Sequence, residues 1–264
     1  MTWVASRRVR LAVACLAAAV LAGGAALFVA SGGDDEAATA PPVLLVPGYA
    51  QPTEVMSSLR RALERDGRRV IDVALPSRGT GDIAASARFL ADVAAGTGAE
   101  RVDVVGFSAG ALVVRAYGAR FDDGARLRRA VLLGAPNHGA RIAEVAAATS
   151  PELCFGSCLQ MRPGSAYLRR LNEATGPDEA AYTSVWTAGD SFVRPPSSAV
   201  LAGAVNVRLQ DVCPGANVPH GALVGDALPV GIVLEALGGE LASAPGREDC
   251  RSLSRRGAAA LTRE

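Results

Sequence analysis

The chain of 264 residues contains no lysine, and all 27 of its basic residues are arginine. They nearly balance 26 acidic residues, so the net charge of +1 gives no sign of a phosphate-binding surface and argues against a nucleic-acid-binding module. Glycine follows no period, which excludes a collagen, and a hydrophobic share of 50% excludes a disordered polymer. Histidine is scarce, with two residues, and we expect neither a metal nor a cofactor.

Residues 1–31 differ in composition from the rest of the chain. Three arginines precede an uncharged, mostly apolar stretch over 11–30. A basic segment before an apolar run is typical of an export signal, but this run is also long enough to span a bilayer. We therefore expect a signal peptide, giving a secreted protein, or an anchor that holds it on the outer face of the cytoplasmic membrane. The residues before Cys15 match a lipobox poorly, so a lipoprotein is the least favoured alternative.

From residue 43 onwards, short apolar segments alternate with amphipathic ones, after a small-residue and acidic linker over 32–42. We expect strands over 43–46, 69–73, 102–105, 130–133, 182–186 and 205–209. We expect helices over 53–64, 82–95, 109–119 and 221–237. This alternation predicts an α/β domain over 43–239, with about six mostly parallel strands and helices on both faces. Residues 240–264 are polar and rich in arginine, and we expect a peripheral tail.

The pentapeptide Gly-Phe-Ser-Ala-Gly at residues 106–110 carries the clearest chemical signal. A strand is predicted before it and a helix after it, which is the context of a nucleophile elbow. The flanking glycines let the backbone pass close to itself, so the serine can sit exposed at a strained turn. The alternative is a glycine-rich turn with a solvated serine. We predict that Ser108 is a nucleophile.

A serine hydroxyl needs a base to accept its proton, and the chain offers only His138 and His220. His220 follows the last predicted strand and a loop, where the histidine of this topology falls. His138 comes directly after the fourth predicted strand, in a loop that we expect to shape the rim beside the serine. We therefore predict His220 as the base.

The imidazole needs an acid that orients it. Asp190 follows the fifth predicted strand, which gives the chain order serine, acid, histidine. Asp211, at the end of the sixth predicted strand, is the rival. Asp226 is interpreted as a solvated helix residue and Asp103 as a polar position within a strand. We predict Asp190 as the acid.

A tetrahedral oxyanion needs two backbone donors. The elbow supplies the N–H of Ala109, which directly follows the serine. The second donor is expected in the turn after the first strand, where the most plausible group is the N–H of Tyr49. An ordinary β-turn is the alternative at that place.

These motifs resemble those of the small bacterial secreted lipases of the α/β-hydrolase fold, often called class 2 lipases. The resemblance runs from about residue 42 to residue 239. It rests on Pro-Val-Leu-Leu-Val-Pro-Gly-Tyr at 42–49, Val-Val-Gly-Phe-Ser-Ala-Gly at 104–110, Leu-Gly-Ala-Pro-Asn-His-Gly at 133–139, Val-Trp-Thr-Ala-Gly-Asp at 185–190 and Val-Pro-His-Gly-Ala-Leu at 218–223. Residues 153–160 also look like the cysteine loop of the actinobacterial members. The family's usual His-Gly at the oxyanion turn is Pro-Gly here. The resemblance implies hydrolysis of carboxylic esters, commonly acylglycerols, without a cofactor.

Four cysteines lie outside the apolar N-terminal stretch, and their spacing lacks the paired CxxC motifs of a zinc site. An even number in an exported chain favours disulfides, of which three pairings are possible. We expect Cys154–Cys158, which would staple a local turn, and Cys213–Cys250, which would pin the C-terminal tail to the domain.

The leading hypothesis is a secreted, monomeric serine hydrolase that acts on acylglycerols or other lipid esters. Residues 11–30 would associate it with a membrane if they are retained. Between residues 136 and 182 there is room for a rim, so we expect minimal or no lid. One alternative keeps the same machinery but passes the acyl group to an alcohol or a cell-wall sugar. Another is a catalytically silent hydrolase fold that serves as an envelope binding module.

Overall fold

The computed structural model describes residues 40–122, 126–174, 181–239 and 241–262. The expected signal peptide or anchor and most of the linker therefore lie outside the described residues. One sheet is formed by β1 (Val43–Val46), β2 (Val70–Asp72), β3 (Val102–Phe107), β4 (Leu127–Leu133), β5 (Ala181–Trp186) and β6 (Val205–Arg208). Its order is β2-β1-β3-β4-β5-β6 and every neighbouring pair is parallel. The predicted α/β architecture is confirmed, with all rather than most pairs parallel.

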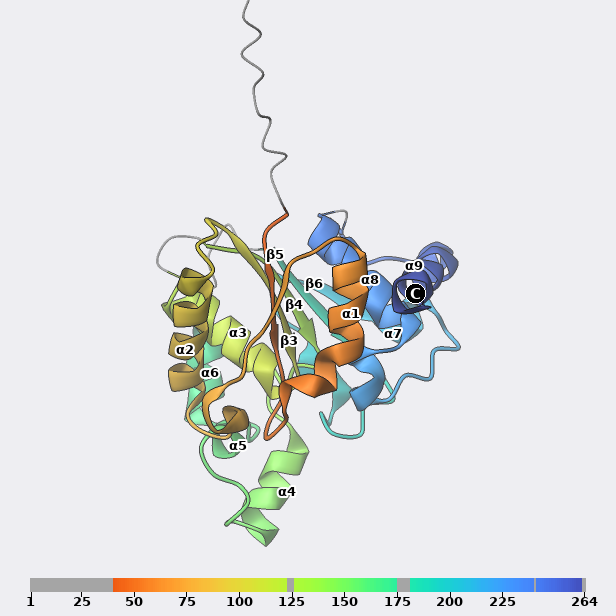
Figure 1. The fold of residues 1–264 in the computed structure, drawn as a ribbon. Coiled ribbons are helices and arrows are strands. Elements are labelled where there is room, and N and C mark those ends of the chain that lie inside the picture. Colours follow the sequence, from red (N-terminus) through yellow and green to blue (C-terminus); the bar gives the residue numbers. More distant parts are fainter. Residues whose placement is uncertain (1–39, 123–125, 175–180, 240, 263–264) are drawn as a thin grey trace, which may run out of the picture. The chain divides into compact units, whose positions relative to one another are not determined.

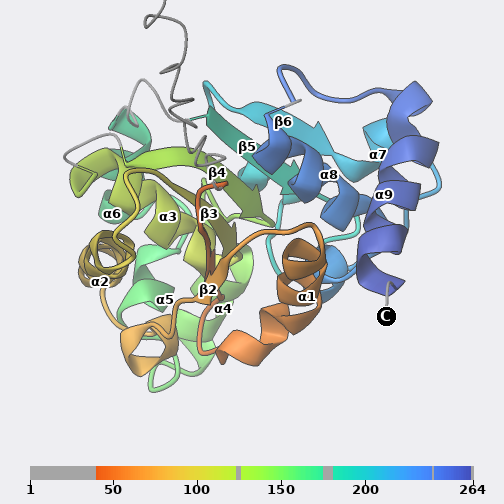
Figure 2. The same cartoon turned by 45° about the horizontal axis from the view of Figure 1, so that its top comes forward.

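Helices cover both faces of the sheet, because its central strands are apolar on both sides. One face carries α1 (Ser57–Arg65), α8 (Ala227–Gly238) and α9 (Cys250–Thr262), and the other carries α2 (Ile83–Gly96), α3 (Ala109–Arg120) and α6 (Ala166–Glu173) (Figures 1 and 2). Successive side chains of β1 point to opposite faces of the sheet. Leu45 packs in the core beneath α1, α8 and α9, and Leu44 packs in the core beneath α2, α3 and α6.

The register of the sheet brings the ends of its central strands to one edge. Val46 pairs with Gly106, Phe107 with Leu133, and Leu133 with Val185. The loops after β1, β3, β4 and β5 therefore start side by side. In open α/β sheets, ligand sites are built from the loops at this carboxyl edge.

The single helix expected over 221–237 is a wrong prediction, because two elements share that range. A short 3-10 helix, η4 (His220–Val224), ends at Gly225, and α8 starts anew after Asp226. The Asp226 carboxylate accepts a hydrogen bond from the Leu228 N–H at 3.1 Å. Asp226 is thus the N-cap of α8, a favoured place for aspartate, and not a solvated residue within a helix.

The C-terminal segment is more than the peripheral tail that its polar composition suggested. Most of its described part is α9, which buries Leu253 and Ala260 in the core beside α8. The two helices approach closely where each has a glycine: a Cβ on Gly257 would overlap the Ala227 carbonyl oxygen, and one on Gly231 would overlap a carbonyl oxygen of α9. Leu253, Gly257 and Ala260 therefore attach this segment to the core of the domain.

The described residues between β4 and β5 form three helices that we did not expect. Besides α6 these are α4 (Arg141–Thr149) and α5 (Ser157–Gln160), which lie together beyond the sheet's lower edge in Figure 1. No lid is evident among the described residues, as expected. The remaining short elements are η1 (Thr53–Met56), η2 (Pro76–Gly79), η3 (Pro196–Ala199), α7 (Leu209–Val212) and η5 (Arg247–Asp249).

Both expected disulfides are present, Cys154–Cys158 and Cys213–Cys250. The first closes the turn between α4 and α5, and the second joins the residue after α7 to the first residue of α9. Within the part of the chain that the structure describes, no helix has the length and apolar character needed to cross a membrane.

Candidate active site

Ser108 forms the sharp turn between β3 and α3, with a φ of 53° and a ψ of −123°. Non-glycine residues rarely adopt a positive φ, and the neighbouring glycines explain how this turn is tolerated. A Cβ on Gly106 would lie 2.6 Å from the Ala111 Cα, and one on Gly110 would overlap the Pro47 carbonyl oxygen. Both positions of the pentapeptide therefore require glycine, and the predicted strand-turn-helix context is present.

The backbone of Ser108 is held by two hydrogen bonds. Its N–H donates to the Leu133 carbonyl at 2.8 Å, and its own carbonyl accepts from the Ala111 N–H at 3.0 Å. Ala109 is the first residue of α3, where N–H groups have no partner within the helix. The helix dipole also favours negative charge at this end. The predicted oxyanion donor therefore lies where an anion is stabilised.

The turn after β1 packs directly on the elbow, since a Cβ on Gly48 would come within 3.1 Å of the Ser108 Cβ. Gln51 closes this turn with two hydrogen bonds. Its side-chain oxygen accepts from the Gly48 N–H at 3.1 Å, and its backbone N–H donates to the Gly48 carbonyl at 3.2 Å. Among the residues that the structure describes, the Tyr49 N–H has no acceptor. This group remains available as the predicted second donor.

His220 and Asp190 meet at a distance of 2.6 Å between Nδ1 and Oδ2. Their exposed fractions are 6% and 1%. The second carboxylate oxygen of Asp190 accepts from the backbone N–H groups of Phe192, at 2.9 Å, and Val193, at 2.8 Å. A proton on Nδ1 that donates to this carboxylate leaves Nε2 free to accept one. The pair is therefore arranged as an oriented base.

The packing around the imidazole places it beside the elbow. The rings of Phe107 and Phe192 lie with their centroids 5.0 and 5.4 Å from that of His220. A Cβ on Gly134 would come within 2.9 Å of the His220 Cε1. Phe107 precedes the serine, so the base and the elbow share this neighbourhood. Among the described residues the Ser108 hydroxyl forms no hydrogen bond, so its bond to Nε2 stays a prediction; such bonds often tighten only with substrate.

The rival residues lie in other environments. His138 is exposed, and its Nδ1 is 3.3 Å from the side-chain nitrogen of Asn172. Asp211 is exposed on α7 and pairs with Arg208 at 3.4 Å. Asp103 is fully buried at the opposite end of β3, where Arg128 binds its carboxylate with two hydrogen bonds. None of these contacts involves His220.

The comparisons with known proteins concern the fold that carries these residues. The family described as "alpha/beta hydrolase fold" matches residues 41–156. Lipase B of Aspergillus fumigatus is similar in structure, with 19% identity, a TM-score of 0.65, and coverage of 84% of this chain and 62% of that one. The protein has the α/β-hydrolase fold.

Two further solved structures extend this comparison. The mature form of the Bacillus licheniformis lipase BlEst2 matches this chain with 14% identity, a TM-score of 0.61, and coverage of 76% of this chain and 93% of that one. Phospholipase PlaB of Legionella pneumophila has 15% identity, a TM-score of 0.60, and coverage of 83% of this chain and 62% of that one. The chain thus spans less than two thirds of the Aspergillus and Legionella proteins. No curated protein sequence matches it significantly.

Several residues that support the site were not anticipated. Gln51 closes the predicted oxyanion turn, and the Phe192 and Val193 amides hold Asp190, the predicted acid, through contacts that the sequence alone does not indicate. Arg115 was detectable in principle, since it stands alone among the apolar residues of α3. Its buried guanidinium donates to Asn137, at 3.2 Å, and to Asn172. Burial lowers the pKa of Arg115 to about 10.

Several large apolar side chains are exposed in the described part of the molecule. Among them, Leu153 is 66% and Phe192 52% exposed. Six of them, which we call the apolar rim, lie on α4, in residues 153–159 and in the loop after β5: Ile142, Val145, Leu153, Phe155, Leu159 and Phe192. Two of these residues contact predicted site residues: Phe192 packs on His220, and the Leu153 carbonyl accepts a hydrogen bond from the Tyr49 hydroxyl. An apolar rim beside a polar site suits a substrate with an apolar portion.

Proposed function

We propose that this protein is a serine carboxylic-ester hydrolase in which Ser108, His220 and Asp190 form the triad. The observation that carries the proposal is the 2.6 Å contact between His220 and Asp190, both buried beside a strained serine elbow. A histidine whose Nδ1 is bound by a buried carboxylate is an oriented base, and the elbow presents the hydroxyl that needs one.

In the proposed mechanism, His220 Nε2 accepts the Ser108 proton while Oγ attacks the ester carbonyl carbon. The carbonyl oxygen becomes an oxyanion and accepts hydrogen bonds from the Tyr49 and Ala109 N–H groups. The imidazolium, stabilised by Asp190, then donates its proton to the leaving alcohol. Water attacks the acyl-enzyme by the same route, which releases the acid and restores Ser108.

We propose a lipid ester, such as an acylglycerol, as the substrate. The apolar rim supports this choice, because an acyl chain needs apolar surface next to the reacting carbonyl. The similar solved structures include two lipases and a phospholipase. The motifs also resemble those of the small secreted bacterial lipases.

We further propose that the enzyme acts as a monomer outside the cytoplasm, with residues 1–31 as signal peptide or anchor. Two disulfides are compatible with an oxidising location. Expression of the full chain in a bacterial host, with fractionation and N-terminal sequencing, tests this. A mature N-terminus near residue 31 in the medium indicates cleavage, whereas the full chain in the membrane fraction indicates anchoring. Full-length protein in the cytoplasm would contradict both.

The activity test uses the purified chain and p-nitrophenyl esters of increasing acyl length, with Ser108→Ala as the matched control. A fluorophosphonate should label Ser108 of the wild type, as peptide mass analysis would show. Folded wild-type protein that neither hydrolyses these esters nor reacts with the probe would refute the proposal and favour a silent binding module. Hydrolysis that gives way to acyl transfer when alcohols are added would favour the acyltransferase alternative.

A further inference from the structure

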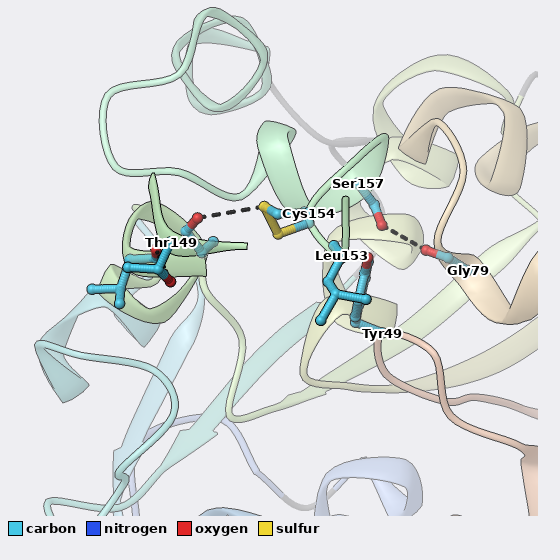
Figure 3. Close-up of a disulfide and its surroundings, with 9 residues drawn as sticks. Tyr49, Gly79, Thr149, Leu153, Cys154 and Ser157 are labelled. Atoms are coloured by element: carbon cyan, nitrogen blue, oxygen red, sulfur yellow. Dashed lines mark hydrogen bonds between the residues drawn. A yellow bond between two sulfur atoms is a disulfide. The ribbon is translucent and has the colours of Figure 1, made fainter. Parts of the chain in front are cut away.

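The side chain of Tyr49 connects the oxyanion turn to the loop closed by the Cys154–Cys158 disulfide. Its hydroxyl donates a hydrogen bond to the Leu153 carbonyl at 2.9 Å, across 104 residues of sequence (Figure 3). Burial raises the pKa of Tyr49, which is partly offset by a backbone hydrogen bond from Phe155. The phenol therefore stays protonated and can donate at neutral and mildly alkaline pH.

The disulfide loop, which we define as residues 153–158, is braced against the neighbouring segment of the chain. The Ser157 hydroxyl donates to the Gly79 carbonyl at 2.6 Å (Figure 3). The Ser157 N–H donates to the Thr80 carbonyl at 3.2 Å. Gly156 has a φ of 49°, and any Cβ there would overlap the same Thr80 carbonyl. The backbone of the disulfide loop at Gly156 therefore lies too close to the backbone of Thr80 for any side chain to fit between them.

The opposite side of the disulfide loop rests on α4. The Cys154 sulfur lies 3.5 Å from the Ala143 carbonyl oxygen. Because this sulfur is bonded to Cys158 and carries no proton, the approach is a packing contact and not a hydrogen bond. The bridge holds the Cα atoms of Cys154 and Cys158 5.1 Å apart, and Cys154 directly follows Leu153. The acceptor of the Tyr49 hydroxyl is therefore fixed from both sides.

We propose that the disulfide loop positions the oxyanion turn through the Tyr49 hydroxyl, which makes the Tyr49 side chain a positioning residue for the reaction. This inference rests on the proposed function, in which the Tyr49 N–H stabilises the oxyanion. Gln51 holds the Gly48 end of the turn, and the hydroxyl holds the Tyr49 end. The carbonyl of Leu153 touches no reacting atom, so its effect is confined to the placement of the N–H.

The kinetic consequence follows from how oxyanion donors work. They act at 2.7–3.1 Å from the oxyanion and contribute mainly in the transition state. A small displacement of the turn should therefore lower kcat and leave KM almost unchanged. Since a misplacement of about 1 Å can cost about 100-fold, a partial release of the turn should cost about 10-fold.

The first test is Tyr49→Phe, which keeps the ring and removes only the hydroxyl. We expect kcat for p-nitrophenyl butyrate to fall about 10-fold, at nearly constant KM. Affinity for a trifluoromethyl ketone, which forms an anionic tetrahedral adduct with serine, should fall by a similar factor. The matched control is Tyr182→Phe at the start of β5, whose buried hydroxyl has no hydrogen-bond partner within the described residues; its kcat should match the wild type.

The second test removes the bridge with Cys154→Ser and Cys158→Ser together. We expect a similar fall in kcat, and combining these changes with Tyr49→Phe should add little, because all three disrupt one connection. Wild-type kcat in Tyr49→Phe, or losses that multiply in full, would overturn the inference. If the serine double variant fails to fold, Tyr49→Phe alone decides. Absence of Ser108-dependent hydrolysis in the wild type would instead refute the proposed function, and this inference with it.

Discussion

Ser108 occupies a backbone conformation that costs of order 1–3 kcal/mol at a non-glycine residue. The elbow maintains it because Gly106 and Gly110 leave no room for side chains and because Leu133 and Ala111 bind the serine backbone. None of these contacts involves the hydroxyl. Removing the hydroxyl should therefore leave the fold intact, which allows its chemical role to be tested in isolation.

Ser108→Ala and His220→Ala should each abolish nearly all esterase activity, by on the order of 10⁴-fold or more. The matched control is His138→Ala, which should cost much less because that imidazole is exposed and contacts Asn172. Activity on p-nitrophenyl butyrate and circular dichroism of all three variants measure function and folding together. An inactive His138→Ala beside an active His220→Ala would show that the assignment of the base is wrong.

Asp190→Asn should lower turnover by roughly 10⁴-fold. The amide oxygen can still accept from the Phe192 and Val193 N–H groups, but its NH₂ group faces His220 Nδ1 and favours the wrong tautomer. Asp211→Asn is the matched control, because that carboxylate is exposed and pairs only with Arg208 within the described structure. We expect a mild effect there. Comparable losses in both variants would contradict a single triad acid.

The residues with proposed chemical roles were easier to select from the sequence than those that hold them in place. Ser108, Asp190 and His220 follow from one motif and the chain order of three residue types. Gln51 and the amides of Phe192 and Val193 act through loop conformations that leave no pattern in the sequence. The Tyr49 hydroxyl reaches a carbonyl 104 positions away, which no local pattern predicts.

At the scale of elements, strands were predicted more accurately than helices. The strand β1 is a continuous apolar run and occupies the range expected for it. The strand β5 contains Thr183 and Ser184, and it still differs from its expected range by only one residue. The helix α4 was missed because Ala143 is its only buried residue and its larger apolar side chains point outwards. The helix α9 was interpreted as a tail because Leu253, Gly257 and Ala260 are too few to stand out among arginines.

Gly257→Ala tests the importance of the α8–α9 contact. Alanine favours helices, but a Cβ at this position would overlap the Ala227 carbonyl oxygen, so we expect a loss of about 1–3 kcal/mol in the free energy of unfolding. The matched control is Gly96→Ala at the end of α2, where a Cβ meets nothing within 4 Å. That variant should change stability by less than about 1 kcal/mol, in the stabilising direction. Urea denaturation measures both, and equal stabilities would show that α9 packs more loosely than the structure indicates.

At the scale of the whole molecule, the predicted site is assembled from loops that share one edge of the sheet. Pro47 follows β1, Ser108 follows β3, and Asp190 comes soon after β5. The alignment of these strands was predictable from their order, because parallel strands present their carboxyl ends together. The residues of the apolar rim were not predictable in the same way, since their side chains are exposed and lie on α4, in residues 153–159 and in the loop after β5. Hydrophobic patterns in a sequence indicate which side chains are buried, and the side chains of this rim are exposed.

The two disulfides should have separable effects on stability and catalysis. Cys213 and Cys250 are 37 residues apart and Cys154 and Cys158 are 4 apart. The chain-entropy model assigns about 4 kcal/mol to the longer loop and about 2 kcal/mol to the shorter one. The longer bridge also joins the loop that leads to His220 with α9, which packs on α8. The shorter bridge lies beside the oxyanion turn.

We therefore expect the paired serine variant of Cys213 and Cys250 to lose more free energy of unfolding in urea. The paired variant of Cys154 and Cys158 should lose more kcat at a temperature where both remain folded. Both quantities should be measured on both variants. The variant with the larger loss of unfolding free energy should be the one with the smaller loss of kcat. If the Cys154–Cys158 variant were instead the less stable one with unaltered kcat, that bridge would stabilise the fold and have no part in positioning the site.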